Sequence, residues 1–88
     1  MDVYNIILKD GWDVNFRSFD KPIQDRIMKK ILQLRHSNTA RHLQHGFQFF
    51  VHEVGSYRIA FENYEREKTR RIIFVGTHKQ YEKWYSSL

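Results

Sequence analysis

The last part of the sequence contains residue types that can move protons, hold phosphates and stack on bases. An apolar run at residues 72–75 is followed by Gly76 and then His78, so we predict a buried strand that ends at the glycine. An imidazole gives or takes a proton near neutral pH, and an aromatic ring offers a face to an unpaired base. The remaining groups of this kind follow directly: Lys79, Tyr81, Lys83, Trp84 and Tyr85. This end of the chain therefore predicts a functional site.

Arg58 is the second group with useful chemistry. It lies within a predicted strand at residues 57–64, on the face opposite Ile59 if side chains alternate. A guanidinium in the middle of a sheet loses hydration unless it finds an anionic partner, and its planar fork suits a phosphate. An ion pair with Glu62 or Glu53 is the structural alternative to a phosphate site.

Three of the C-terminal residues share one face if this segment is a helix. His78, Tyr81 and Tyr85 stand at spacings of three and four. A tyrosine there could donate a proton or stack on a base. We expect Trp84 to anchor the segment to the core, and a histidine at the end of a strand can also be exposed without a role.

The elements that must position these groups follow from periodicity and from turn residues. Asp20 is expected to cap a helix by accepting a hydrogen bond from its first amides, and Pro22 suits the first turn. The expected fold is one small α+β domain over residues 1–88, with helices on one face of a twisted sheet and the other face open. We predict strands at residues 3–8, 47–54, 57–64 and 69–78, a helical hairpin at residues 12–19 and 21–35, a polar connector at residues 41–46, and a short terminal helix or tail at residues 79–88.

Composition limits the possible classes of protein. The chain has 88 residues, no cysteine and a formal net charge of +5, with acidic residues concentrated in the first twenty. The missing cysteines exclude a disulfide scaffold and fit a cytoplasmic protein, and neither a membrane span nor a secretory signal is expected. A basic surface suits a nucleic acid or an acidic protein partner, although it can also be simply hydrated. His42 and His45 have ligand-like spacing, but no cysteine or well-placed carboxylate joins them, so neither a metal nor a cofactor is expected.

Two motifs resemble one known family when they are taken together. They are VGSYRI at residues 54–59 and FVGTHKQYEKW at residues 74–84. With the predicted element order, this pattern resembles the RelE/ParE superfamily of bacterial and archaeal toxins. The resemblance implies a type II toxin–antitoxin system whose toxin is restrained by an antitoxin from the same operon. RelE, YafQ and HigB relatives are ribosome-dependent endoribonucleases that cut mRNA in the A site, whereas ParE relatives inhibit DNA gyrase.

The resemblance also implies residue roles. Arg58 matches the arginine that stabilises the scissile phosphate. His78 stands where RelE has a second arginine and where YafQ and HigB relatives have a histidine. Tyr85, or alternatively Tyr81 or Trp84, would occupy the aromatic position near the C-terminus.

Some positions depart from the family pattern. Phe49 and Val51 stand where RelE carries lysines, and Glu53 stands where an arginine often precedes the VG pair. The general base is therefore not matched, and His52 and His45 are the available substitutes.

The implied reaction needs no metal, because RNA carries its own 2′-hydroxyl nucleophile. Arg58 would stabilise the charge on the phosphorane, and His78 and a tyrosine would transfer protons. The expected partners are an acidic antitoxin and mRNA on the ribosome. The alternative is a protein of the same fold without nuclease activity, either a gyrase inhibitor or an inactive antitoxin-binding homologue. The expected RNA contacts are Arg26, Lys29, Lys30, Lys79, Lys83 and His52.

Overall fold

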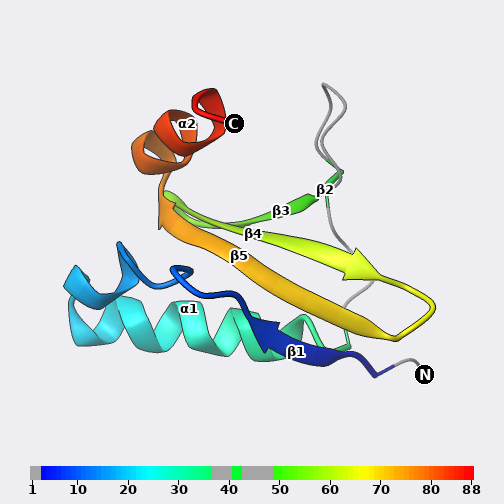
Figure 1. The fold of residues 1–88 in the computed structure, drawn as a ribbon. Helices are drawn as coiled ribbons and strands as arrows, with labels where there is room; N and C mark the ends of the chain where they lie inside the picture. Colours follow the sequence, from blue (N-terminus) through cyan, green and yellow to red (C-terminus); the bar gives the residue numbers. More distant parts are fainter. Residues whose placement is uncertain (1–2, 37–40, 43–48) are drawn as a thin grey trace.

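The structure is a computed structural model that describes residues 3–36, 41–42 and 49–88, with backbone only at residues 41–42. Figure 1 shows one sheet with helices on both sides of it. The elements follow in the order β1 (Asn5–Leu8), a 3₁₀ turn η1 (Phe16–Ser18), α1 (Lys21–Gln33), β2 (Arg41–His42), β3 (Phe50–Val54), β4 (Tyr57–Tyr64), β5 (Thr69–Thr77) and α2 (His78–Ser86).

The described strands form a single sheet in the order β1-β5-β4-β3-β2. β1 pairs in parallel with β5, with Asn5 opposite Thr69, and the other neighbours are antiparallel. β4 is the middle strand, as expected for the strand that carries Arg58. The α+β fold with one twisted sheet is therefore confirmed.

α1 covers one face of the sheet with the apolar side of the helix. Ile27, Ile31 and Leu34 are buried against side chains of β4 and β5. Their spacing of three and four residues places them on one stripe of the helix, as the sequence pattern predicted. The sheet residues of this main core are Val54, Ile59, Phe61, Ile72 and Val75.

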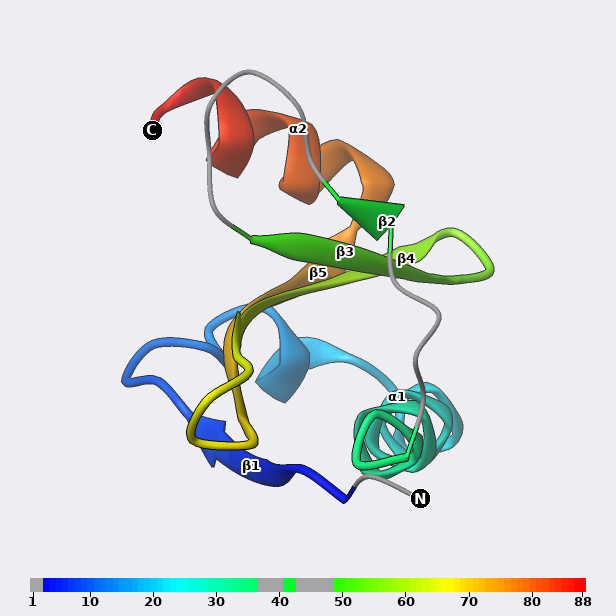
Figure 2. The same ribbon diagram turned by 90° about the vertical axis from the view of Figure 1, so that its right-hand side faces the viewer.

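α2 packs on the other face, where it forms a second core. Figure 2 shows the sheet between α1 and α2. The buried sheet residues here are Phe49, Val51, Ala60 and Phe74, and three aromatic side chains of α2 pack on them. The expectation that this face is open was therefore wrong at the end of the sheet where α2 lies. The aromatic residues of α2 need an apolar surface, and these four residues provide it.

A β-bulge in β5 explains how one strand can serve both cores. Ala60 is paired with Phe74, but its neighbour Phe61 is paired with Ile72, so β5 has one extra residue, Ile73. Strict alternation would place Ile72 and Phe74 on the same face. The bulge instead places Ile72 in the main core and Phe74 under α2.

Two details around the first helical segment differ from the prediction. Only Phe16–Ser18 is helical in the segment at residues 12–19, and it is a 3₁₀ turn, so α1 has no partner α-helix there. Asp20 does occupy the N-cap position of α1, but its side chain makes no capping hydrogen bond. Lys21 and Pro22 open the helix as expected.

Other boundaries shift by a few residues. β4 has the predicted bounds, β5 ends at Thr77, and His78 begins α2. Arg41–His42 forms a short strand against β3 where a polar connector was expected, and residues 43–48 lie outside the described part. No helix among the described residues is long and apolar enough to cross a membrane.

Arg70 joins the elements of the main core. Its side chain is buried, with only 4% exposed. Nη1 donates to the carbonyl of Leu34 at 2.7 Å, and Nε donates to Oδ1 of Asn63 at 2.9 Å. The guanidinium also lies 3.8 Å from the ring centre of Tyr4. One side chain therefore connects the C-terminal end of α1 with β4, β5 and the segment before β1.

We predict that Arg70→Met lowers the free energy of unfolding by about 2–3 kcal/mol, because the buried acceptors lose their charged donor. Arg71→Met is the matched control. Arg71 pairs with Glu62 at 2.6 Å but is partly exposed to water, so its loss should cost clearly less than the loss of Arg70. Urea denaturation measures both variants, and equal losses would contradict this role for Arg70.

Candidate active site

Arg58 lies in the middle of the sheet, on the face that α2 partly covers. Its neighbours across the sheet are Glu53 on β3 and Gly76 on β5. Ala60, two residues along β4, belongs to the core under α2, so alternation places Arg58 on the same face. The side chain is 15% exposed, which leaves part of the guanidinium accessible.

The backbone fixes the guanidinium of Arg58. Nη1 donates to the carbonyls of Gly55 and Tyr57, both at 3.0 Å. Nε lies 3.8 Å from Oε2 of Glu53, whose side chain is about half exposed. An ion pair with Glu62 was the other structural alternative, and Glu62 instead holds Arg71. Arg58 is therefore oriented by carbonyls and is not sealed within a carboxylate pair.

His78 is the first residue of α2, and a capping box fixes where this helix starts. Oγ1 of Thr77 accepts from the backbone N–H of Gln80 at 3.1 Å, and the side chain of Gln80 accepts from the N–H of Thr77 at 2.8 Å. The imidazole is 53% exposed, and its Nε2 contacts Oε1 of Glu82 one turn later. His78 can therefore meet a ligand from solvent.

The turn between β3 and β4 holds both candidate groups. The carbonyl of Gly55 accepts from Arg58, and the carbonyl of Ser56 accepts from the backbone N–H of His78 at 2.8 Å. Gly55 has φ +58°, which favours glycine at the first position of a two-residue hairpin turn. Sequence reasoning placed a turn here but missed its role, because no sequence signal shows which side chains donate to its carbonyls.

The aromatic side chains of α2 dock on the sheet. The ring of Trp84 stacks on Phe74 with centres 4.7 Å apart and lies edge-on to Phe49 at 5.3 Å. The rings of Tyr81 and Tyr85 are stacked with centres 6.0 Å apart. This packing supports the anchoring role predicted for Trp84.

Tyr81 is the tyrosine with an electrostatic link to Arg58. Burial raises the pKa of its hydroxyl above the ordinary value of 10, the nearby Tyr85 adds to this rise, and the charge of Arg58 opposes it. The hydroxyl is buried and has no hydrogen-bond partner among the described atoms. A phenol with a raised pKa keeps its proton at neutral pH, so Tyr81 can act as a hydrogen-bond donor.

The other predicted contacts are distributed over both helices. Lys79 and Lys83 are exposed on α2, whereas Arg26 and Lys29 are exposed on α1, and Lys30 is half-buried there. His52 is paired with Ile59, a residue of the main core, so it faces α1. His52 is therefore not placed to act as the substitute base beside Arg58, because alternation puts the two on opposite faces. His45, the other substitute base, lies outside the described residues.

Two other kinds of site were considered among the described residues: a metal site and a surface hollow. Among the residues whose placement is described, no group of three or more His, Asp or Glu side chains could hold a metal ion. A surface hollow of about 390 Å³ is lined by Ile7, Tyr64, Glu67, Thr69 and Arg71. It lies beside the β4–β5 hairpin tip, at the end of these strands away from α2, and it contains none of the predicted site residues.

We predict that Tyr81→Phe leaves the free energy of unfolding unchanged or raises it by up to about 1 kcal/mol, because the hydroxyl that it removes is buried without a partner. Tyr4→Phe is the same chemical change at a hydroxyl that donates to Glu65 at 3.0 Å, and it should cost about 1 kcal/mol. Thermal and urea unfolding measure both, and a larger loss for Tyr81→Phe than for Tyr4→Phe would contradict the burial of an unpaired hydroxyl.

Comparisons with known proteins show the fold. No protein-family model matches the sequence, and no curated protein matches it significantly. Solved structures do match: the RelBE2 toxin–antitoxin complex of Mycobacterium tuberculosis has a TM-score of 0.80 at 15% identity, over 88% of this chain and 93% of that chain.

Two further matches cover similar shares of the chain. A free Escherichia coli RelE mutant gives a TM-score of 0.75 at 15% identity, over 94% of this chain and 92% of its own. The archaeal RelE–RelB complex of Pyrococcus horikoshii gives 0.69 at 12% identity, over 85% of this chain and 94% of that chain. This chain therefore has the fold of the RelE toxins.

Proposed function

We propose that the protein is the toxin of a type II toxin–antitoxin system and a ribosome-dependent endoribonuclease of the RelE type. The observation that supports this proposal best is the convergence of Arg58 and His78 on the Gly55–Ser56 turn. A fixed guanidinium and an accessible imidazole at the same turn are what phosphodiester cleavage in RNA requires. The RelE fold and the two sequence motifs favour this reaction over other uses of such a pair.

The reaction moves one proton and exchanges one bond. The 2′-oxygen bonds to the adjacent phosphorus, the bond from phosphorus to the 5′-oxygen breaks, and a proton passes from the 2′-oxygen to the 5′-oxygen. Arg58 stabilises the negative charge that grows on the phosphorane, because its N–H groups are held in place before the reaction begins. His78 carries the proton, since its imidazole is exposed and a ring nitrogen can both take and give a proton.

Tyr81 has a supporting role in this proposal. Its hydroxyl stays protonated at neutral pH and lies close enough to Arg58 for the guanidinium to influence its pKa. Because the hydroxyl is buried, we assign Tyr81 a role through Arg58: the phenol stays uncharged and leaves the guanidinium to the phosphate. Tyr85, which stacks on Tyr81, supports that ring and offers a surface for a base.

The ribosome supplies the remaining contacts. The basic residues of both helices bind the RNA backbone through salt-sensitive contacts with phosphates. We expect the protein to act in the cytoplasm, where translated mRNA is found. The residues proposed for these contacts are Arg26, Lys29, Lys30, Lys79 and Lys83.

We predict that Arg58→Ala and His78→Ala each lower mRNA cleavage by ~10²–10⁴-fold, because each removes a group that acts in the transition state. The measurement is growth after induction of the chain alone, with mapping of mRNA 5′ ends and purified translation reactions. Arg17→Ala is the control, because Arg17 is an exposed arginine on η1 that pairs only with nearby Asp13 in the described part.

If Arg58→Ala and His78→Ala both arrest growth as strongly as the wild type, the proposed nuclease mechanism is refuted. Growth arrest with intact mRNA and an induced DNA-damage response would instead support the gyrase inhibitor. Thermal unfolding of each variant separates loss of chemistry from loss of fold.

We also propose an acidic antitoxin as the protein partner. The net charge of +5 favours such a partner, and the matched structures include RelE proteins bound to RelB antitoxins. We predict that co-expression of an acidic protein encoded beside this chain restores growth and that the two proteins co-purify. Growth arrest that persists with every adjacent open reading frame expressed would contradict this.

A further inference from the structure

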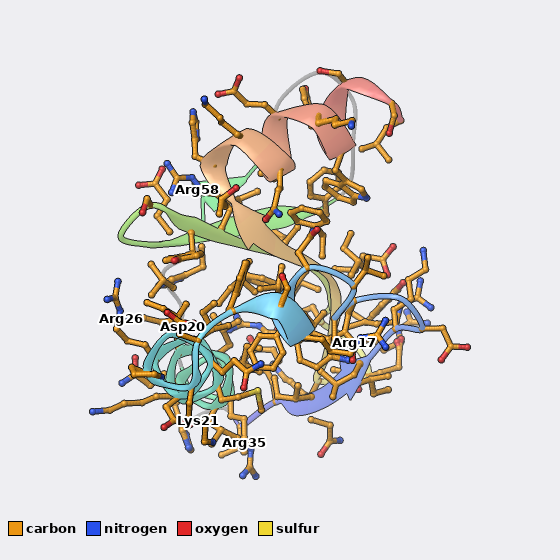
Figure 3. The ribbon with its side chains drawn as sticks, turned by 90° about the vertical axis from the view of Figure 1, so that its left-hand side faces the viewer. Arg17, Asp20, Lys21, Arg26, Arg35 and Arg58 are labelled. Carbon is orange, nitrogen blue, oxygen red and sulfur yellow. The ribbon has the colours of Figure 1, made fainter. Side chains whose placement is uncertain are left out.

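A second guanidinium lies against the turn that holds the candidate active site. A Cβ atom placed on Gly55 would lie only 2.8 Å from Nη2 of Arg26, which reaches the turn from α1. The missing side chain at Gly55 thus makes room for the end of Arg26. Arg58 reaches the same residue from β4 and donates to its carbonyl. Figure 3 shows Arg26 and Arg58 on the two sides of the turn.

The structure gives Arg26 no acceptor within the described part of the chain. Asp25, its acidic neighbour on α1, is paired with Lys21 at 2.7 Å. Arg58 likewise uses Nη1 and Nε for its contacts with Gly55, Tyr57 and Glu53, which leaves Nη2 without a hydrogen bond there. Both guanidiniums therefore present open donors beside one exposed turn.

Two open guanidiniums on either side of a turn suit a ligand with anionic groups in a row. Gly55 and Ser56 are both exposed, and neither carries a large side chain. An extended ligand can therefore lie close to the backbone of this turn. A nucleic-acid strand carries one charge per nucleotide, and a guanidinium binds a phosphate with two N–H groups at once.

We propose that Arg26 binds the phosphate next to the scissile one, so that the RNA strand crosses the Gly55–Ser56 turn from Arg58 towards α1. This inference rests on the proposed nuclease function. It gives Arg26 a role distinct from Lys29 and Lys30: Arg26 positions the substrate strand, and it is not one of the groups that exchange protons.

The experiment combines protein variants with altered mRNA on programmed ribosomes. After the cut is mapped, the phosphate on its 5′ side or on its 3′ side is replaced by an uncharged methylphosphonate. Single-turnover kcat/KM is measured for the wild type, Arg26→Gln and Arg35→Gln. The control Arg35→Gln is the same chemical change on an exposed arginine just after α1 that points away from the turn in Figure 3.

We predict that Arg26→Gln lowers kcat/KM on unmodified mRNA by about tenfold, the typical size of one charge-assisted contact. It should lose nothing more on one of the two methylphosphonate mRNAs, because that mRNA already lacks the partner phosphate. The dependence of log kcat/KM on log salt should become shallower by about 1. Arg35→Gln should stay within about twofold of the wild type on every mRNA, since a lone exposed charge contributes little.

Three outcomes would overturn the inference. They are a change of less than twofold for Arg26→Gln, an undiminished loss on both methylphosphonate mRNAs, and an equal loss for Arg35→Gln. The second outcome would place Arg26 on ribosomal RNA. Failure of the proposed function looks different: wild type and Arg58→Ala would then cut mRNA equally, or neither would cut it. Arg26→Lys, which keeps the charge, distinguishes a lost contact from a damaged fold if it recovers part of the rate.

Discussion

The alignment of β4 with β5 determines where the two candidate groups, Arg58 and His78, lie. Arg58 lies opposite Gly76, and α2 begins two residues after that glycine, so one strand register places the guanidinium and the imidazole at the same end of the sheet. Gly76 itself leaves no room for a larger residue. A Cβ there would come within 2.7 Å of Cζ of Phe74 and 3.0 Å of Oε1 of Gln80, the ring that supports α2 and the amide that caps it. A change at Gly76 would therefore disturb both the docking of α2 and its first turn.

Much of the fold could be predicted from local patterns. Strict alternation over residues 57–64 gave β4 its correct bounds, and the apolar stripe gave α1 to within two residues of its end. The second core could not be predicted, because it depends on the bulge at Ile73, which reverses the faces of the residues after it. Alternation alone cannot show an inserted residue in a strand that is apolar on both faces. The helix predicted at residues 12–19 is only a 3₁₀ turn at Phe16–Ser18. Helical spacing over a few residues does not determine the length or the type of a helix.

The residues of the candidate site could be chosen by their type, but their arrangement could not be predicted from the sequence. Arginine, histidine and tyrosine could be selected by type, and strand order placed Arg58 in the middle of the sheet. The carbonyl of Gly55 orients the guanidinium of Arg58, and the carbonyl of Ser56 holds the backbone of His78. Backbone acceptors such as these have no residue type to reveal them. Tyr81 and Tyr85 share a helix face, so periodicity could not choose between them. Packing distinguishes Tyr81, whose hydroxyl is enclosed near Arg58. The position of His52 could not be predicted, because it depends on the pairing of β3 with β4. In the structure His52 lies opposite Ile59, which places it on the face away from Arg58.

The parallel pairing of β1 with β5 has a consequence for how the protein is made. Asn5 pairs with Thr69, so the first strand cannot join the sheet until β5 has left the ribosome. Contacts between distant parts of a sequence form slowly, because the intervening chain must first be closed into a loop. During synthesis the growing polypeptide has Arg58 before it has the strand and helix that bring His78 beside it. The candidate site is therefore completed only after β5 and the start of α2 have been synthesised.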